Sequence, residues 1–129
     1  MTAWTSAELA AIADADELRI ASQRSDGTLR EPVIIWVVRD GDNLYVRAYK
    51  GRDGAWFRGA RQRHQGHIRA GGIDKDVTLV EESDTAINDR IDAAYRAKYG
   101  RYGASYLDPM VADAARAATL RLAPGAESR

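Results

Sequence analysis

The chain of 129 residues has the length of a single domain, and its 45% hydrophobic and 29% charged residues argue against a disordered polypeptide. Its 19 basic and 19 acidic residues leave no net charge, which disfavours a general nucleic-acid-binding protein, and the absence of cysteine excludes disulfides, thiolate metal sites and cysteine nucleophiles. The acidic N-terminal segment lacks the basic region of a secretory signal, and no apolar run approaches the roughly 18 residues of a membrane span, so we expect a cytoplasmic protein without a membrane partner.

The N-terminal part of the chain predicts one helix and two strands. Thr5 or Ser6 can cap a short first helix. Residues 17–24 alternate between apolar and polar side chains and predict a strand that ends at a turn over 25–27. Residues 32–38 (PVIIWVV) form an almost continuous apolar and β-branched run, which is typical of a strand buried on both faces.

A hairpin and a second helix are predicted next. The sequence D-G-D-N is a hairpin signal, and the following residues 44–49 (LYVRAY) alternate, with Arg47 on the polar face. This strand ends at a glycine-containing junction over 50–54 (KGRDG). Asp53 can cap a helix that ends near residue 62, so the junction connects a strand end directly to a helix start.

The remainder of the chain predicts short strands and two further helices. Residues 67–70 and 77–80 have the composition of short strands around a glycine pair. Apolar side chains at helical spacing predict a strong helix over 85–98 that ends at a glycine. Another helix is predicted from Asp108-Pro109 to about residue 117, with proline at its first position, and a final strand over 119–122.

These elements predict an α+β fold in one domain. The order is helix, three strands, helix, two strands, two helices and a last strand. Short hairpins in the first half favour antiparallel pairing, and six short strands with helices outside them indicate a small barrel or a strongly twisted sheet. We expect the domain to span 1–125 and the tail 126–129 to be frayed.

The residues 43–69 carry most of the positive charge and predict an anion-binding site. The stretch holds seven basic residues and one acid, so its local balance is +6 and the rest of the chain sums to −6. Arg47, Lys50 and Arg52 can converge on a phosphate at the junction, with Arg58 or Arg61 contributed by the following helix. The alternative is a solvated charged face whose arginines pair with acids from elsewhere. The junction matches no glycine-rich phosphate fingerprint.

Aromatic side chains lie between these cations. Tyr49 and Trp56 can form the wall of a site for a flat ring, whereas Trp36, inside an apolar strand, is expected in the core. Core packing remains the alternative for Tyr49 and Trp56 as well. Together with the cations, these rings would suit a phosphorylated ring compound.

Four other side chains are candidates for proton transfer: His64, Asp92, Tyr95 and Tyr102. A solvated helix face is the alternative for Asp92, while the tyrosines that follow the long helix can line a pocket or an interface. The spacing of His64 and His67 is a weak metal signal without a third ligand, so no metal site is expected.

Several segments resemble the flavin-type split β-barrels, the group that includes pyridoxamine-phosphate-oxidase-like flavoproteins and deazaflavin-dependent nitroreductases. The segments are PVIIWVV, the D-G-D-N hairpin, LYVRAYKG and AWFRGARQR. A closer likeness, carried most specifically by INDRIDAAYRAKY, is to an uncharacterised bacterial family of unknown function within that group. The resemblance implies a six-stranded antiparallel split β-barrel with flanking helices, a homodimer, and small-molecule pockets at the subunit interface.

The resemblance also implies where a cofactor would lie. In the group, basic residues at the end of the LYVR-like strand and in the following turn hold the flavin phosphate, and these positions here are Arg47, Lys50 and Arg52. Members that bind flavin commonly have serine or threonine after that strand, where this chain has Ala48-Tyr49-Lys50. The bulky rings of Tyr49 and Trp56 would then either wall the flavin or fill its space.

Two functions follow as hypotheses. The first is a dimeric split barrel that binds FMN or a deazaflavin nucleotide and acts as a small-molecule oxidoreductase, in which the cofactor carries the redox chemistry. The second is a cofactor-free split barrel that binds a small organic metabolite, either as a binding protein or as an acid–base isomerase or cyclase. In the second case the four proton-transfer candidates would carry the reaction.

Overall fold

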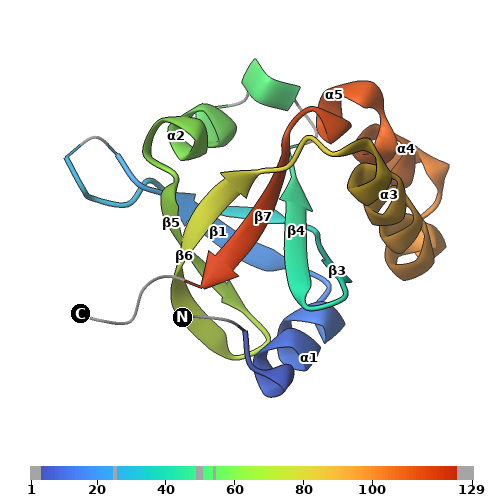
Figure 1. The fold of residues 1–129 in the computed structure, drawn as a ribbon, viewed down its shortest axis with the longest axis horizontal. Helices are drawn as coiled ribbons and strands as arrows, with labels where there is room; N and C mark the ends of the chain where they lie inside the picture. The colour runs from blue at the N-terminus through green and yellow to red at the C-terminus, as the bar shows by residue number, and fades with distance from the viewer. Residues whose placement is uncertain (1–3, 25, 49–50, 54, 125–129) are drawn as a thin grey trace.

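A sheet of seven antiparallel strands forms the centre of the protein in the computed structural model, which describes residues 4–24, 26–48, 51–53 and 55–124. The strands are β1 (Leu18–Ser22), β2 (Val33–Ile35), β3 (Val37–Asp40), β4 (Asn43–Arg47), β5 (Gln65–Ala70), β6 (Ile73–Glu81) and β7 (Thr119–Pro124), in the sheet order β2-β1-β5-β6-β7-β4-β3. The helices of the described residues are α1 (Ser6–Asp14), η1 (Gly51–Asp53), α2 (Ala55–Arg63), α3 (Thr85–Tyr99), η2 (Gly100–Tyr102), α4 (Ala104–Val111) and α5 (Asp113–Arg116) (Figure 1).

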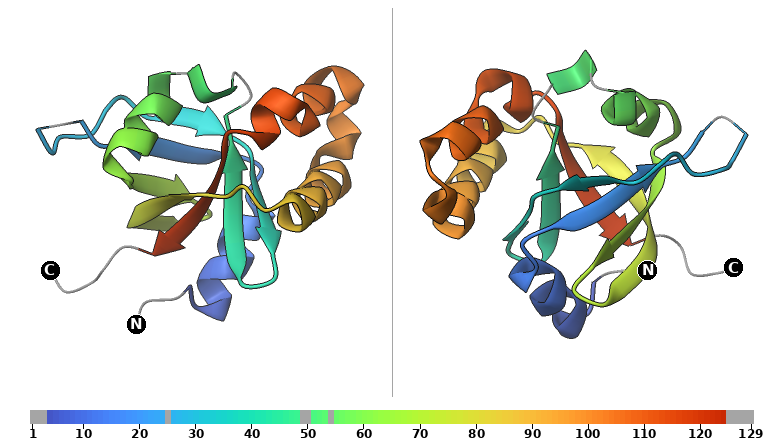
Figure 2. Two further views of the ribbon diagram at one scale, coloured as in Figure 1. Left: turned by 45° about the horizontal axis from the view of Figure 1, so that its top comes forward. Right: turned by 180° about the vertical axis from the view of Figure 1, so that it is seen from behind.

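The sheet closes into a barrel because its two edge strands, β2 and β3, belong to one continuous segment of the chain. β2 pairs with β1 and β3 pairs with β4, while only Trp36 separates β2 from β3 along the chain. The chain bends at Trp36, whose ring stacks on that of Tyr99 with 4.0 Å between centroids. The result is a strongly curved barrel with helices outside it, as Figures 1 and 2 show. The α+β class and the antiparallel barrel expected from the sequence are confirmed.

The strands differ from the sequence prediction in detail. The single strand predicted over 32–38 is divided at Trp36, so the structure has seven strands where six were expected. The division follows from the barrel: one half of the segment pairs with β1 and the other half with β4, and a single straight strand cannot follow both partners. β5 and β6 also extend beyond the predicted 67–70 and 77–80, because backbone pairing continues through polar residues that have no strand pattern of their own.

The predicted helix from Asp108-Pro109 is also different. α4 begins four residues earlier, at Ala104, and holds Pro109 in its last turn, and α5 is a separate short helix. Gly103, with a φ of 90° that favours glycine, precedes α4, and the extended backbone of Ala112 separates the two helices. The helix start is therefore set by a glycine turn rather than by the proline.

Inward-pointing side chains from every strand fill the barrel. Ile20, Ile68 and Leu79 are fully buried there, and apolar residues of α1 and α2 pack into the same core. Figure 2 shows these two helices at opposite ends of the barrel. At one end, the Trp4 indole donates a hydrogen bond of 2.8 Å to the Leu122 carbonyl, which attaches the N-terminal segment to β7.

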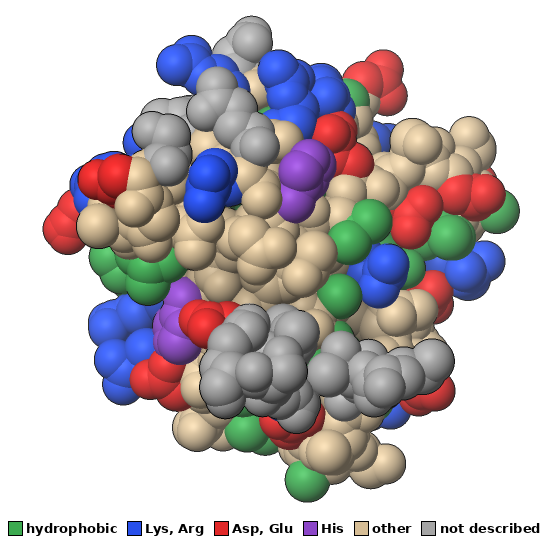
Figure 3. Space-filling view, turned by 60° about the vertical axis from the view of Figure 1, so that its left-hand side comes forward, with side chains coloured by type: hydrophobic (Ala, Val, Ile, Leu, Met, Phe, Trp, Pro, Cys, Tyr) green, Lys and Arg blue, Asp and Glu red, His purple; other side chains and the backbone are tan. Residues whose placement is uncertain are grey.

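A second apolar layer lies outside the barrel. The outward faces of β3 and β4 are covered by α3 and α4, as Figure 1 shows. The buried side chains of this layer are Val38, Tyr45, Ile91, Tyr95, Tyr99 and Met110. The opposite outer face, on β1, β5 and β6, instead presents acidic, basic and histidine side chains (Figure 3). Among the described residues no helix is long and apolar enough to cross a membrane.

Two isoleucines on the neighbouring strands β1 and β2, one buried and one exposed, give a direct test of the fold. Ile20→Ala removes a fully buried side chain from the barrel interior and should lower the free energy of unfolding by about 2–5 kcal/mol. Ile34→Ala changes a side chain that is 55% exposed on the neighbouring strand and should stay within about 0.5 kcal/mol of the parent chain. Urea unfolding measures the stability of both variants. Equal losses of stability would contradict the placement of Ile20 inside the barrel and Ile34 on its surface.

Candidate functional site

Arg47 lies inside the protein, beneath α3. The alternation predicted for its strand is observed, because Tyr45 and Arg47 both point out of the barrel, but α3 and α4 cover that face. Arg47 is 1% exposed. Its guanidinium donates five hydrogen bonds, and the acceptors are Thr119 Oγ1, Asp92 Oδ1, the Met110 carbonyl and the carbonyl and side-chain oxygens of Asn88.

This position corrects the role expected for Arg47. A guanidinium has five N–H donors, and in Arg47 each has an acceptor within the protein, so none remains for a phosphate. The acceptors belong to α3, to the end of α4 and to β7. Arg47 is therefore a structural anchor that joins these elements to β4. The alternation of its strand predicts that Arg47 points outward, but no local pattern predicts the helix above it.

Asp92 is shared between two arginines. One carboxylate oxygen accepts from Arg47 at 2.5 Å, and the other accepts from Arg116, which also donates to the exposed Asp89. Asp92 itself is buried. With both oxygens engaged by guanidinium groups, Asp92 serves as the central charge of this network rather than as a free proton acceptor.

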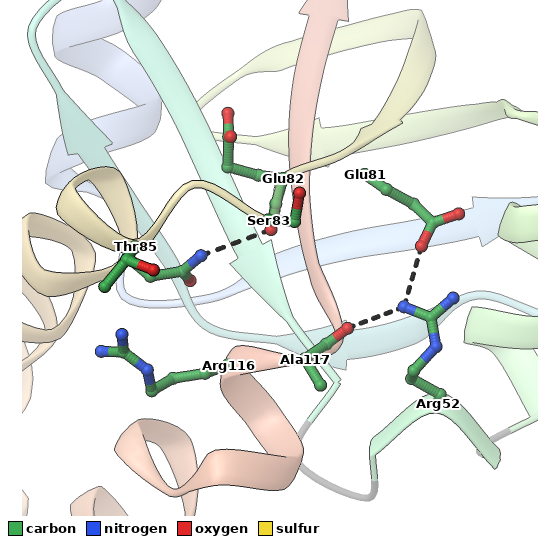
Figure 4. Close-up of a pocket in the computed structure, with 8 residues that line it drawn as sticks. Arg52, Glu81, Glu82, Ser83, Thr85, Arg116 and Ala117 are labelled. Carbon is green, nitrogen blue, oxygen red and sulfur yellow. Dashed lines mark hydrogen bonds and ion pairs between the residues drawn. The ribbon is translucent and has the colours of Figure 1, made fainter.

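A polar pocket of about 250 Å³ lies next to this network. It is formed where the end of β6, the start of α3, η1 and the α5–β7 connection meet (Figure 4). The lining residues are Arg52, Glu81, Glu82, Ser83, Thr85, Asn88, Arg116 and Ala117. Among the residues predicted to bind a cofactor that the structure describes, Arg52 is the one in this wall.

Arg52 reaches the pocket from the predicted junction. Its Nη1 donates to the Ala117 carbonyl at 2.8 Å and pairs with Glu81 at 2.8 Å, and its guanidinium lies over the Phe57 ring. The side chain remains 41% exposed. Because these contacts engage one nitrogen, the other N–H groups of Arg52 can meet a ligand at the mouth of the pocket.

Arg116, Ser83 and Thr85 were not predicted as site residues. Arg116 follows Arg52 by more than sixty positions in the sequence, and nothing in its alanine-rich surroundings indicates a ligand. Ser83 directly precedes Asp84, the N-cap of α3, and so lies in the wall through the start of that helix. The pocket depends on the packing of η1 against α5 and on the Arg52–Glu81 ion pair that joins η1 to the end of β6, and no local pattern predicts these contacts.

The other cofactor candidates lie around α2 or outside the described residues. Arg58 is exposed on α2. Trp56 is half-buried, packs against the barrel core and meets Phe57 edge to face at 6.2 Å between centroids. Tyr49 and Lys50 lie outside the described residues.

The structure does not bring the four proton-transfer candidates together in one site, although Asp92 and Tyr95 both contact the buried Arg47. His64 follows α2, where its Nδ1 lies 3.2 Å from the Leu79 carbonyl. Tyr95 is fully buried, its hydroxyl has no hydrogen-bond partner among the described residues, and burial raises its pKa. Tyr102 lies beyond the other end of α3 from the pocket, and this helix of 15 residues is about 22 Å long.

Tyr102 belongs to an aromatic stack instead. Its ring stacks on Trp36 at 5.6 Å between centroids, next to the Trp36–Tyr99 pair. Beside this stack the Lys98 ammonium donates to the Val37 carbonyl at 2.7 Å, and partial burial lowers the pKa of Lys98 to about 8. Tyr99, the last residue of α3, and Tyr102 thus pack against the bend between β2 and β3 rather than line the pocket, while Tyr106 is exposed.

His67 lies on the outer face of the sheet between two carboxylates. Its Nδ1 pairs with Asp76 at 2.7 Å, and its Nε2 pairs with Asp74. Partial burial alone would lower the pKa of His67, but the hydrogen bonds to Asp76 and Asp74 outweigh it and raise the pKa above 6.5. No group of three or more candidate ligands able to hold a metal ion occurs among the described residues.

The raised pKa predicts how stability depends on pH. Since the folded state holds the His67 proton more tightly than the unfolded state, the contribution is fully present below about pH 6.5 and is lost as pH rises through the folded pKa. An NMR titration of the His67 ring protons measures that pKa. Asp76→Asn should lower it and should shrink the loss of stability above pH 6.5; an unchanged pKa would contradict the pairing.

A second prediction concerns the buried network. Asp92→Asn removes the charge that offsets Arg47 and should lower the free energy of unfolding by about 3–5 kcal/mol, because a buried guanidinium is left without a counter-charge. Asp89→Asn, the same change at an exposed partner of Arg116, is the control and should have little effect. Equal effects in chemical denaturation would show that Arg47 is not held as described.

Solved structures with the same fold cover almost the whole chain. A protein provisionally assigned as a pyridoxamine 5'-phosphate oxidase from Listeria innocua has a TM-score of 0.65 at 14% identity, covering 92% of this chain and 90% of its own. An FAD-binding protein from Mesorhizobium loti has a TM-score of 0.64 at 15% identity, covering 95% and 91%. The heme storage protein HutZ from Vibrio cholerae has a TM-score of 0.63 at 14% identity, covering 91% and 87%.

These likenesses establish a split-barrel fold, as the segments of the first half of the sequence implied. A search of curated protein sequences found no relative of this chain. A protein-family profile, described as "Uncharacterized protein conserved in bacteria (DUF2255)", matches residues 8–122. Since the match covers nearly every helix and strand described above, the chain belongs to this bacterial family of split-barrel proteins.

Proposed function

We propose that the protein binds a flavin-type nucleotide, FMN or a deazaflavin, at the basic junction and acts as an oxidoreductase on a small molecule. The observation that carries the proposal is Arg52, whose partly exposed guanidinium stands at the mouth of a pocket directly after β4. The FAD-binding protein of the same fold supports it, since that protein shows that such a barrel can hold a flavin. Arg58, exposed on the neighbouring α2, supplies a second cation.

The residues present fit a phosphate group better than a whole nucleotide. Arg52 has donors that the protein does not use, and guanidinium groups bind phosphate strongly. The pocket of about 250 Å³, however, is smaller than the roughly 300–1,000 Å³ of sites that enclose drug-sized ligands. One chain would therefore hold the phosphate end, and the ring would lie against Trp56 or a second subunit.

This division of the ligand supports a homodimer as part of the proposal. A second copy would complete a site that a single chain covers only in part. When bound, the flavin would supply the redox chemistry, and this chain would bind its phosphate, orient the ring and shield it from water. A cytoplasmic location and the absence of a nucleic-acid partner belong to the same proposal.

A cofactor-free metabolite-binding protein is the second candidate. The observation in its favour is the pocket itself, which is small, polar and lined by acidic as well as basic side chains. Within this candidate, binding is favoured over acid–base catalysis, because His64, Tyr95 and Tyr102 lie apart and Asp92 is held by two arginines.

Titration with the two cofactors tests the first candidate. An absorbance scan of the purified protein, followed by titration with FMN and with a reduced deazaflavin, should give a yellow protein or binding in the micromolar range. Arg52→Gln should weaken that binding by about tenfold or more, because a hydrogen bond to a charged group contributes about 1.5–3 kcal/mol. No binding of either cofactor would refute the proposal.

Arg69→Gln is the matched control for this titration. Arg69 is an exposed arginine on β5, outside the pocket wall, so its replacement should leave cofactor affinity unchanged. Equal losses in both variants would indicate general charge attraction rather than a site at Arg52. Sedimentation of the protein with and without cofactor checks the proposed homodimer.

A further inference from the structure

Four aromatic rings form a series that connects the buried layer beneath α3 to the surface. Tyr95 is fully buried, and its ring centroid lies 6.1 Å from that of Tyr99. Tyr99 stacks on Trp36 at 4.0 Å with an interplanar angle of 1°, and the Tyr102 ring lies 5.6 Å from that of Trp36. Tyr102 is 41% exposed. The series therefore provides ring contacts all the way from the interior to solvent.

Aromatic rings in such a series can share the loss of one electron. The chain has no cysteine, so tyrosine and tryptophan are the side chains from which a one-electron oxidant most readily removes an electron. An electron passes readily between aromatic rings in contact, so a neighbouring ring replaces the electron that one ring has lost. A tyrosine that lacks an electron is a strong acid, because its phenolic proton is then held by a positively charged ring. The oxidation therefore settles at the tyrosine whose hydroxyl has a base beside it.

Tyr102 has such a base. Its hydroxyl donates to Asp16 Oδ2 at 3.1 Å and accepts from Arg101 at the same distance. Arg101 also donates to Asp16 Oδ2 at 2.7 Å, and this hydrogen bond lowers the pKa of Asp16, so the carboxylate is ionised at neutral pH. The Arg101 guanidinium lies over the Tyr102 ring, where its charge would oppose the loss of an electron, but its ion pair with Asp16 offsets that charge.

The other hydroxyl groups of the series lack a base among the described residues. Tyr99 donates to the backbone carbonyls of Asp16 and Val37, which do not take up a proton at neutral pH. The Lys98 ammonium also lies 5.0 Å from the Tyr99 ring centroid and opposes the loss of an electron there. The Tyr95 hydroxyl has no hydrogen-bond partner in the described part of the chain. An oxidation anywhere in the series is therefore directed to its exposed end.

We infer that Tyr102 is a site of one-electron oxidation, at which the protein donates an electron to a dissolved one-electron oxidant such as a high-valent metal complex. The oxidant gains one electron, the phenolic O–H bond of Tyr102 breaks, and its proton passes to the Asp16 carboxylate. A neutral tyrosyl radical remains. Two such radicals combine by a carbon–carbon bond between their rings to give dityrosine, and the hydrogens on those carbons return to the phenolic oxygens. The reaction uses neither the pocket nor the proposed cofactor.

Tyr106 provides the matched comparison, because exposure alone would make it the preferred target. Tyr106 is 68% exposed, and among the described residues no ring stacks on it and no acceptor binds its hydroxyl. Limited oxidation with hexachloroiridate(IV), followed by peptide mass spectrometry, counts the dityrosine cross-links formed at each tyrosine. Tyr102 should give about tenfold or more product than Tyr106, because a positioned base accelerates proton loss. A smaller excess, or a preference for Tyr106, would overturn the inference.

Replacing the base tests the proton transfer. Asp16→Asn keeps an oxygen beside the Tyr102 hydroxyl but removes its basicity, and the yield at Tyr102 should fall by about tenfold. Asp14→Asn makes the same charge change at an exposed residue two positions away and should leave the yield unchanged. An unchanged yield in the Asp16 variant, or equal losses in both variants, would show that Asp16 does not accept the proton.

Removing the final ring tests the transfer between rings. Tyr102→Phe places a ring that is hard to oxidise at the end of the series, so oxidation in air-saturated buffer should move to Trp36, the neighbouring ring, as oxygen addition to its indole. Circular dichroism confirms that the variant is folded. A shift of the product to Tyr106 instead would mean that exposure rather than contact within the series selects the oxidised residue, and would overturn the inference.

Discussion

The arrangement of the helices depends on one buried cation. Arg47 projects from β4 into the layer beneath α3, where an uncompensated guanidinium would cost several kcal/mol. Asp92 supplies the opposite charge, and Asn88, Met110 and Thr119 supply further oxygens, so that every N–H group of Arg47 has an acceptor. These partners come from α3, α4 and β7. If any of these elements were displaced, the buried Arg47 guanidinium would lose hydrogen-bond acceptors and the folded state would be destabilised. The side chain thereby defines where the helices sit on the barrel.

The same network determines the shape of the pocket. Asp92 also binds Arg116, and Arg116 forms one wall of the pocket. The Arg116 guanidinium is consequently oriented before any ligand arrives, which lowers the entropy lost on binding. On the other wall, Arg52 is tied to the Ala117 carbonyl and to Glu81. Recognition by this pocket is therefore coupled to the packing that holds α3 and α5 against the strands, rather than to a loop that moves independently.

The split barrel by itself leaves the ligand open. Two solved structures that cover nearly all of this chain have different ligands: one is an FAD-binding protein and the other is a heme storage protein. Different ligands on one scaffold mean that side chains at the site decide recognition. In this chain the decisive features are an exposed guanidinium after β4 and a small polar pocket. The guanidinium favours a nucleotide phosphate, and the small polar pocket favours a metabolite smaller than a nucleotide.

Local patterns in the sequence were sufficient for most of the helices and strands. The Thr5 cap, the alternation over 44–49 and the long helix α3 each depend on neighbouring residues, and each was predicted close to its observed bounds. The bend at Trp36, the burial of Arg47 and the place of Arg116 in the pocket were decided by the tertiary structure. Each requires contacts between distant segments: Trp36 with Tyr99, Arg47 with Asp92, and Arg116 with the wall that Arg52 shares. The sequence alone shows that 43–69 is rich in arginine. The packing of α3 and η1 decides that Arg47 is a structural anchor and that Arg52 faces the pocket. The physical reason is that burial and free hydrogen-bond donors are properties of the folded chain.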